Sequence, residues 1–487
     1  MLIDWVAIAP EIALTITALL VLAADLSLRG EAKQLVNPLA VIGTLVAIGF
    51  TLYLWGDSRE TFAGQFVINE FTVLFKLLFL GSLLAILGIS WRFFAEGRYF
   101  QGEYYFLLLT SFIGMLLLPS SRDLILLFIA LETVSIPAFV MAGLRKRDLY
   151  SSEAAMKFFL IGVLSVALML FGMSMVYGFT GTTSLEGIAA AVAEGESVPL
   201  LLASVMLVFV GFGFKISAVP FHFWAPDTYA GSPMPVAAML AVASKAAGFA
   251  GLIAVAFIAF EPLADVWAPV LGVLAILTMT VGNLFALQQR DVIRLLAYSS
   301  VAQAGYMLIP FGLAQPGNEA VNQAAVQAVL FYLIAYAVMN IGAFGVAIAV
   351  NRRTGLRSIE DYAGLASRSP LLGGAMAVFL LSLGGAPLTV GLWAKFAIIQ
   401  AVAVEITTFG LVLAGFLVLN SVIAFFYYLK VISLIWIADP ADDMPTLQPG
   451  LNLSGVIAVL MIGTVVLGVL PGLVTQGTSI VSLLASG

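Results

Sequence analysis

The chain consists almost entirely of apolar runs that are each long enough to cross a lipid bilayer. A transmembrane helix needs about 20 mostly apolar residues, and fourteen such runs can be marked along the 487 residues. Apolar residues make up 62% of the chain and charged residues 10%, whereas a soluble domain carries about 25% charged residues. The runs are too long for barrel strands and lack their alternation. We therefore predict an all-α membrane protein of about fourteen transmembrane helices.

The predicted spans are joined by short connections. The N-terminus has no basic region before its long apolar run, so we expect it to be retained as the first span rather than cleaved. A short amphipathic helix on the surface is expected at residues 184–194. The spans lie near residues 3–28, 36–55, 70–93, 104–119, 121–144, 153–178, 199–223, 233–260, 266–287, 291–314, 322–350, 370–402, 408–437 and 453–475.

Basic residues indicate the orientation of these spans. If the N-terminus faces outside, the outside connections hold only Arg59 and Arg122, and the inside connections hold 13 basic residues. Because basic connections stay on the cytoplasmic side, we expect both termini on the periplasmic or external face of a bacterial inner membrane. The inside set is Arg29, Lys33, Arg92, Arg98, Arg145, Lys146, Arg147, Arg290, Arg294, Arg352, Arg353, Arg357 and Arg368.

Composition excludes several kinds of site. The chain has no cysteine and one histidine, His222, so thiolate sites are excluded and a histidine-based zinc or haem site is not expected. There is no GxGxxG motif and no soluble domain, so we expect no NADH, flavin or iron–sulfur cluster bound to this chain. No basic arm or patch indicates nucleic acid.

A small set of charged residues remains inside the predicted spans. A charge at the centre of a bilayer costs about 2.5–3.5 kcal/mol on insertion scales, and such residues usually face a bundle interior and mark an ion path. The set is Lys76, Glu132, Lys157, Lys215, Lys245, Lys395 and Lys430.

Depth within the span separates two interpretations of these charges. Lys157 lies near the inner end of its span and can snorkel to the interface. Lys76 and Lys430 are about two turns from a boundary, and snorkelling explains them at least as well as function. The remaining four, Glu132, Lys215, Lys245 and Lys395, lie deep or beside a proline break, and we favour a functional role for them.

Lysine suits proton transfer in such a setting. Burial disfavours its charged form, and a nearby carboxylate favours it. A lysine whose carboxylate partner approaches and recedes can therefore take up and release a proton. Our hypothesis is that Glu132 and Lys215 form such a pair.

Two spans are interrupted at corresponding positions. The seventh contains Pro220, and Pro226 is expected to end its run; the twelfth contains Gly384, Gly385 and Pro387. Interrupted helices at corresponding places in two halves of a membrane chain point to a transporter-type site.

An internal repeat supports this correspondence. RDLILLFIALETVS at 122–135 resembles RDVIRLLAYSSVAQ at 290–303, and Pro220 and Pro387 are separated by almost the same offset. Each copy contains five spans, which is an odd number, so the second copy must cross the membrane in the opposite direction, as in inverted-repeat transporters. Ser299 or Ser300 then falls opposite Glu132. The predicted division is 1–103 for three N-terminal helices, 104–260 and 261–437 for the two five-helix repeats, and 438–487 for a C-terminal helix.

Three motifs carry a family resemblance. They are PFHFWAPDTYAGSPMPVAAMLAVASKAAGFAG at 220–251, LETVSIPAF at 131–139 and RDVIRLLAYSSVAQAGYM at 290–307. Over almost its whole length the chain resembles the antiporter-like subunits of respiratory complex I, the proton-translocating NADH:quinone oxidoreductase, which are related to Mrp-type antiporter subunits. Within that family it is most similar to the subunit N branch, since Lys395 replaces the glutamate of subunit M and only one helix follows the second repeat.

The resemblance implies roles for individual residues. Glu132 matches the glutamate of the fifth helix of the family, and Lys157, Lys215, Lys245 and Lys395 match the lysines of the sixth, broken seventh, eighth and broken twelfth helices.

Two further positions, Gln303 and His222, are interpreted separately. Gln303 stands where the subunit N branch often has histidine. Either the path there runs through water and Gln303 as a hydrogen-bonding group, or that histidine is not essential. His222 is interpreted as a structural or loop-anchoring residue.

The implied function is proton movement through these buried residues, coupled to quinone reduction in other subunits. NADH, FMN, iron–sulfur clusters and quinone are expected in partner subunits, and the implied partners are neighbouring antiporter-like and small membrane subunits. Two alternatives stay open: a Mrp-type cation/proton antiporter subunit and, less favoured, a membrane subunit of an energy-converting hydrogenase.

Overall fold

The structure is a computed structural model that describes residues 3–96, 101–145, 147–195, 198–440, 447 and 449–479. Within this part of the chain, 13 helices are long and apolar enough to cross a membrane. Two shorter apolar helices, α16 (Pro370–Gly384) and α17 (Val390–Val404), follow one another as the halves of one further span. The predicted all-α membrane fold of about fourteen spans is therefore confirmed. Of the basic residues used for orientation, Arg98, Lys146 and the side chain of Arg353 lie outside the described positions.

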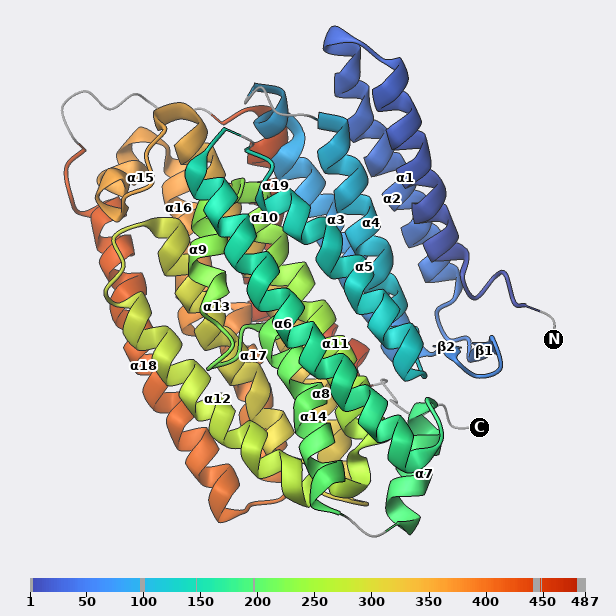
Figure 1. The fold of residues 1–487 in the computed structure, drawn as a ribbon. Helices are drawn as coiled ribbons and strands as arrows, with labels where there is room; N and C mark the ends of the chain where they lie inside the picture. The colour runs from blue at the N-terminus through green and yellow to red at the C-terminus, as the bar shows by residue number, and fades with distance from the viewer. Residues whose placement is uncertain are drawn as a thin grey trace.

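The helices pack side by side into one long bundle (Figure 1). The first two helices lie along one edge of the bundle, beside a small hairpin of β1 (Arg59–Thr61) and β2 (Phe66–Ile68). Besides α16 and α17, the helices are α1 (Ala9–Ser27), α2 (Val36–Tyr53), α3 (Glu70–Glu96), α4 (Gln101–Ser120), α5 (Leu124–Ala142), α6 (Leu149–Thr180), α7 (Leu185–Glu194), α8 (Pro199–Ile216), α9 (Trp224–Gly231), α10 (Met234–Met239), α11 (Lys245–Ala254), α12 (Ala264–Ala286), α13 (Val292–Leu308), α14 (Glu319–Thr354), α15 (Leu365–Arg368), α18 (Thr408–Trp436), α19 (Leu451–Val469) and α20 (Gly472–Ser479).

The eighth span is the most deeply buried. It runs over Met234–Ala259, and every residue of its most apolar window is buried within the bundle. A π-helical turn at Leu240–Ser244 joins α10 to α11, and Lys245 follows it directly. Such turns interrupt the regular backbone hydrogen bonding and occur frequently at functional sites.

A hydrogen-bonded junction lies between the first and second helices of the first repeat. The Asp123 carboxylate caps α5 by accepting from two backbone amides of its first turn, as capping residues do. The Leu124 amide donates to the Thr183 carbonyl, and the Leu185 amide donates to the Arg122 carbonyl, both at 2.9 Å. The chain before α5 is thereby tied to the start of α7, the short amphipathic helix that the sequence predicts.

The second repeat has the same junction after its first helix, at the opposite end of the bundle. Asp291 caps α13, the Val292 amide donates to the Arg357 carbonyl at 3.0 Å, and the Ile359 amide donates to the Arg290 carbonyl at 2.7 Å. One cavity is lined by residues that follow the end of α5 and by Asp291, which precedes α13. The end of α5 therefore lies beside the beginning of α13, so the two copies are inverted.

Both predicted helix breaks are present. α8 ends with Ser217 in the left-handed region (φ 61°), and α16 ends with Gly385 there (φ 94°). The two positions are equivalent under the repeat, since they differ by the same offset as Arg122 and Arg290. At each break the amide of the next residue donates to a carbonyl of the preceding helical turn, at 2.8 Å from Ala218 and 2.9 Å from Ala386, which is a Schellman-type end.

One detail of the seventh span was predicted wrongly. Pro226 does not end the run, because it lies in the first turn of α9. Proline lacks an amide hydrogen, and the first turn of a helix leaves its amides unbonded, so proline is tolerated there.

The snorkelling prediction is wrong for Lys76. Its side chain is 0% exposed, and its ammonium lies 2.8 Å from the Glu11 carboxylate of α1. The same ammonium lies 4.9 Å from the centre of the Phe66 ring. Lys76 and Glu11 thus form a buried ion pair that fastens α3 to α1. Lys430, by contrast, is exposed on α18, as snorkelling requires.

We expect Lys76→Met to destabilise the protein, because Glu11 would keep a buried charge without a partner. Removing one member of a buried ion pair typically costs about 3–5 kcal/mol. The melting temperature of the purified protein in detergent should fall, and adding Glu11→Leu to the same chain should restore most of the loss. A wild-type melting temperature for Lys76→Met alone would contradict this.

Candidate functional site

Lys215 lies in the last turn of α8, directly before the first break. Its side chain is 2% exposed, and its ammonium donates to the Ser135 hydroxyl of α5 at 3.0 Å. Glu132 lies one turn before Ser135 on the same helix, near enough to Lys215 for an electrostatic interaction but not in an ion pair with it. The buried Oε1 atom of Glu132 accepts no hydrogen bond from the described residues. The side chains of the predicted Glu132–Lys215 pair therefore lie near each other without direct contact, and the lysine binds Ser135 instead.

Lys245 connects the two repeats. It belongs to the first copy, is 1% exposed, and donates to the backbone carbonyl of Ser300 at 2.7 Å. Ser300 lies on α13 of the second copy, at the position equivalent to Glu132 under the repeat. In a symmetric molecule this position would carry a carboxylate. Here its backbone carbonyl, a neutral oxygen, binds Lys245.

Lys395 lies just beyond the second break, in α17. Its ammonium donates to the Gly384 carbonyl at 2.5 Å and lies 5.0 Å from the centre of the Tyr306 ring. Gly384 is in the last turn of α16, where the helix end leaves carbonyl groups without intrahelical partners and favours a cation. The break itself thus supplies the oxygen that holds Lys395.

The three central lysines share one property. Lys215, Lys245 and Lys395 are each held by a neutral oxygen, and none joins an ion pair with another described residue. A buried ammonium without a carboxylate partner carries a large desolvation cost. Such a group either gives up its proton or depends on water and a mobile counter-charge.

Buried hydroxyl groups fill the space between the first break and Lys245. Tyr229 of α9 faces Ser217 and Ser300. The hydroxyls of these three residues are buried and make no well-formed hydrogen bond within the described part of the chain. Polar groups left without partners in a buried site are typical positions for internal water.

A second polar cluster lies between Lys245 and Lys395. Gln303 is 0% exposed; its amide donates to the Leu383 carbonyl at 3.1 Å, and its carbonyl accepts from the Tyr332 hydroxyl. The hydroxyls of Ser299 and Tyr428 are hydrogen-bonded to each other. This geometry fits the interpretation in which Gln303 serves as a hydrogen-bonding group.

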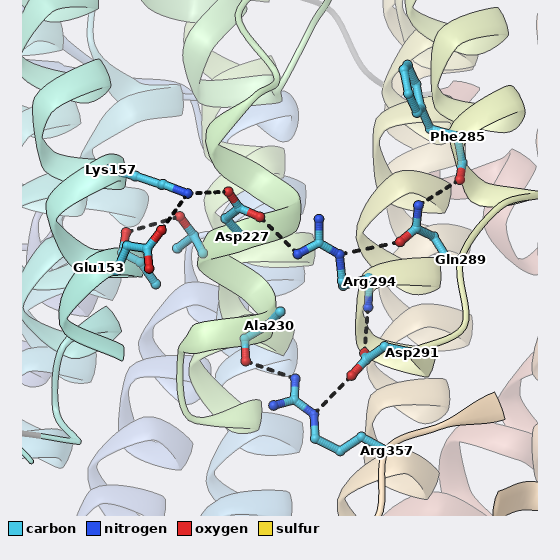
Figure 2. Close-up of polar contacts among 11 residues, drawn as sticks. Glu153, Lys157, Asp227, Ala230, Phe285, Gln289, Asp291, Arg294 and Arg357 are labelled. Atoms are coloured by element: carbon cyan, nitrogen blue, oxygen red, sulfur yellow. Dashed lines mark hydrogen bonds and ion pairs between the residues drawn. The ribbon is translucent and has the colours of Figure 1, made fainter. Parts of the chain in front are cut away.

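Lys157 is the outermost of the predicted site residues. Its side chain is 44% exposed and lies 2.8 Å from Glu153 and 2.7 Å from Asp227, as Figure 2 shows. Asp227 also binds Arg294 of α13 at 2.9 Å. The lysine is therefore not a simple snorkeller, because it belongs to an ion-pair network that joins both repeats.

The network surrounds a cavity of about 410 Å³ at the end of the bundle where α5 ends and α13 begins. The sequence analysis missed this feature, since Asp227 was quoted only within a motif. One signal was present: Asp227 and Lys395 occupy equivalent positions in the two copies of the repeat. The lining residues are Arg145, Asp148, Tyr150, Glu153, Ala154, Lys157, Asp227, Ala230, Gly231, Asp291, Arg294 and Arg357.

His222 takes no part in these contacts. It is 5% exposed within the first break, its ring lies 4.4 Å from that of Phe223, and its Nδ1 atom has no hydrogen-bond partner among the described residues. The same part of the chain contains no group of three or more side chains of the kind that holds a metal ion.

Two inverted copies, a broken helix in each and a row of buried lysines define the antiporter-like class of membrane proteins. The family model for the membrane domain of NADH:quinone oxidoreductase and Mrp antiporters matches residues 121–424. The chain belongs to this family, and the resemblance inferred from the motifs is confirmed.

Two relatives of the chain share the name of one subunit. The protein named NADH-quinone oxidoreductase subunit N 2 in Roseiflexus castenholzii is 41% identical, with 90% of this chain and 88% of the relative covered. NADH-quinone oxidoreductase subunit N of Chlorobium chlorochromatii is 38% identical, with 94% and 91% covered. The similarity to the subunit N branch is thereby confirmed.

Solved structures give the same fold. A chain of respiratory complex I from Thermus thermophilus is 31% identical and superposes with a TM-score of 0.79, covering 98% of this chain and 100% of that one. A chain of the Mrp complex from Dietzia is 18% identical, with a TM-score of 0.81 and coverages of 98% and 97%. At that identity the second match speaks for the fold alone.

We expect Gln303→Leu to be harmful and Gln303→His to be tolerated. Leucine would leave the buried Tyr332 hydroxyl and Leu383 carbonyl unpaired, which costs about 1–3 kcal/mol for each group, whereas histidine can still bind Tyr332. Proton translocation by membranes carrying each variant provides the measurement. Equal activity of the leucine variant and the wild type would show that Gln303 is not part of the polar path.

Proposed function

We propose that this chain is the subunit N type of membrane subunit in a proton-translocating NADH:quinone oxidoreductase, and that it moves protons through its own buried residues. The observation that carries the proposal is the set of three buried lysines, each bound to a neutral oxygen. The names of the relatives support the assignment to this complex.

In the proposed path Glu132 and Lys215 form the switch. The two side chains interact without direct contact, and Lys215 is held by Ser135. An approach of the carboxylate would favour the ammonium, and its withdrawal would favour the neutral amine. A change in the Glu132–Lys215 separation therefore alters the proton affinity of Lys215, and no redox centre is needed within this chain.

From Lys215 the proton passes to Lys245 and then to Lys395. The buried hydroxyls of Ser217, Tyr229 and Ser300 offer hydrogen-bonding positions for water on the first step. Gln303, Tyr332, Ser299 and Tyr428 form the polar connection on the second. Lys395 is the proposed exit group, and Lys157 with its network lies at the uptake end.

The rest of the assembly supplies the energy. Oxidation of NADH and reduction of quinone are assigned to partner subunits, which would hold NADH, FMN, iron–sulfur clusters and quinone. Neighbouring antiporter-like and small membrane subunits are the proposed partners. Because the connections at the end of the bundle beside the cavity are basic, this end is placed at the cytoplasm, which leaves both termini on the periplasmic face of the bacterial inner membrane. The division into 1–103, 104–260, 261–437 and 438–487 is retained as part of the proposal.

A Mrp-type cation/proton antiporter subunit is the second candidate. The family that matches this chain includes Mrp antiporters, and the same buried charges would serve an exchanger. The two candidates differ in their driving force. Neighbouring genes for other complex I subunits favour the first, and a multigene antiporter cluster favours the second.

We expect Lys245→Ala to abolish most coupled proton translocation in the assembled complex. A positioned proton-transfer group typically contributes a factor of about 10²–10⁴, so a fall of at least about tenfold is expected. The measurement is proton uptake into inverted membrane vesicles during NADH oxidation, with assembly checked on native gels.

Lys430→Ala is the matched control, because Lys430 is exposed on α18 and should tolerate the change. Wild-type translocation by a fully assembled Lys245→Ala complex would contradict the proposed relay.

A further inference from the structure

The second half of the broken seventh helix, α9, is held in place by charge. The backbone between α8 and α9 is not helical from Ser217 to Phe223, so helical hydrogen bonds do not fix α9 relative to α8. Asp227 is in the first turn of α9, and its two carboxylate oxygens bind different partners. Oδ2 lies 2.7 Å from Lys157, and Oδ1 lies 2.9 Å from Arg294 (Figure 2).

The partners of Asp227 come from different repeats. Lys157 is on α6 of the first copy, and Arg294 is on α13 of the second. The far end of α9 is anchored as well, because Arg357 donates to the Ala230 carbonyl at 2.8 Å and lies 3.4 Å from Asp291. Only Asp227, among the residues that the structure describes, carries an ion pair to each repeat at this cavity.

The link reaches the proposed proton path on both sides. α9 also carries Tyr229, which faces the buried hydroxyls beside Lys215 and Lys245. α13 carries Ser300, whose carbonyl holds Lys245. A displacement of α9 relative to α13 would therefore change the surroundings of Lys245 as well as the geometry of the first break.

The three charged side chains of the Lys157–Asp227–Arg294 bridge are accessible to water. The side chains of Lys157, Asp227 and Arg294 are 44%, 34% and 37% exposed, and each such pair alone contributes little to stability. Removing the carboxylate, however, would leave two cations facing the same short helix without the anion between them. We therefore expect the bridge to affect the position of α9 rather than the stability of the fold.

We propose that Asp227 is a positioning residue that couples the two repeats through the Lys157–Asp227–Arg294 bridge, which holds α9 and thereby the first half of the proton path in register with the second. The inference rests on the proposed function. The repeat adds independent support, since Asp227 and Lys395 stand at equivalent positions, so that both copies carry a charged residue in the half-helix beyond the break.

The test uses the assembled complex in native membranes. For each variant, assembly is measured on native gels, and proton uptake is measured relative to the rate of NADH oxidation. Asp227→Asn should assemble normally and lower that ratio about threefold or more, within the range by which residues that couple two sites act. Asp227→Glu, which keeps the charge, should retain most of the wild-type ratio.

Asp148→Asn is the matched control. Asp148 lines the same cavity, pairs with Arg145 at 3.7 Å rather than with a residue of α9, and caps α6; asparagine also caps a helix well. This variant should keep the wild-type ratio. Arg294→Gln should resemble Asp227→Asn, and the double variant should be no worse than either single one, because the two residues would act in one bridge.

Three outcomes would overturn the inference: a wild-type ratio for an assembled Asp227→Asn complex, an equal fall for Asp148→Asn, or independent losses that add in the double variant. If Asp227→Asn fails to assemble, Arg294→Gln decides, and a wild-type ratio for that variant counts against the bridge. Failure of the proposed function would look different, because Lys245→Ala would then translocate protons normally.

Discussion

Three lysine ammonium groups buried without a carboxylate partner are the constraint on which this structure depends. Each ammonium needs an oxygen to bind, and each binds an oxygen in a different structural setting. Lys215 uses the Ser135 hydroxyl, Lys245 the Ser300 carbonyl across the boundary between repeats, and Lys395 a carbonyl freed at a helix end. These contacts hold the side chains in place but do not neutralise them. A membrane bundle that keeps such groups gains sites whose charge can change.

One helix break serves this requirement directly. Carbonyl groups inside a helix already accept an intrahelical bond, although the Ser300 carbonyl of α13 also accepts from Lys245, whereas a helix end leaves carbonyl groups without intrahelical partners. The left-handed residues Ser217 and Gly385 end α8 and α16 inside the bundle. The second break supplies the oxygen for Lys395, and the first separates Lys215 from the charged half-helix α9. Inverted duplication sets one break near each end of the path, and the loss of symmetry at Ser300 gives the two halves different chemistry.

Much of this arrangement could be predicted because its signals are local in the sequence. Long apolar runs indicated the spans, proline and glycine indicated the breaks, and one repeated offset indicated the inversion. The partners of the charges could not be predicted, since they depend on which distant helices meet. Glu11 and Lys76 lie on α1 and α3, and Lys157 and Asp227 lie on α6 and α9, so nothing in the spacing of either pair indicates contact. Depth alone misjudged Lys76, because a charge near a boundary can face the bundle as readily as the lipid.

The central claim is that the buried lysines exchange protons along a hydrated path. The most direct test is a structure of the whole assembled complex at a resolution that shows ordered water. The account predicts water bound to the ammonium groups of Lys215, Lys245 and Lys395 and beside the unpaired hydroxyls of Ser217, Tyr229 and Ser300. Dry, apolar packing between these three lysines, in a complex that still translocates protons, would contradict it.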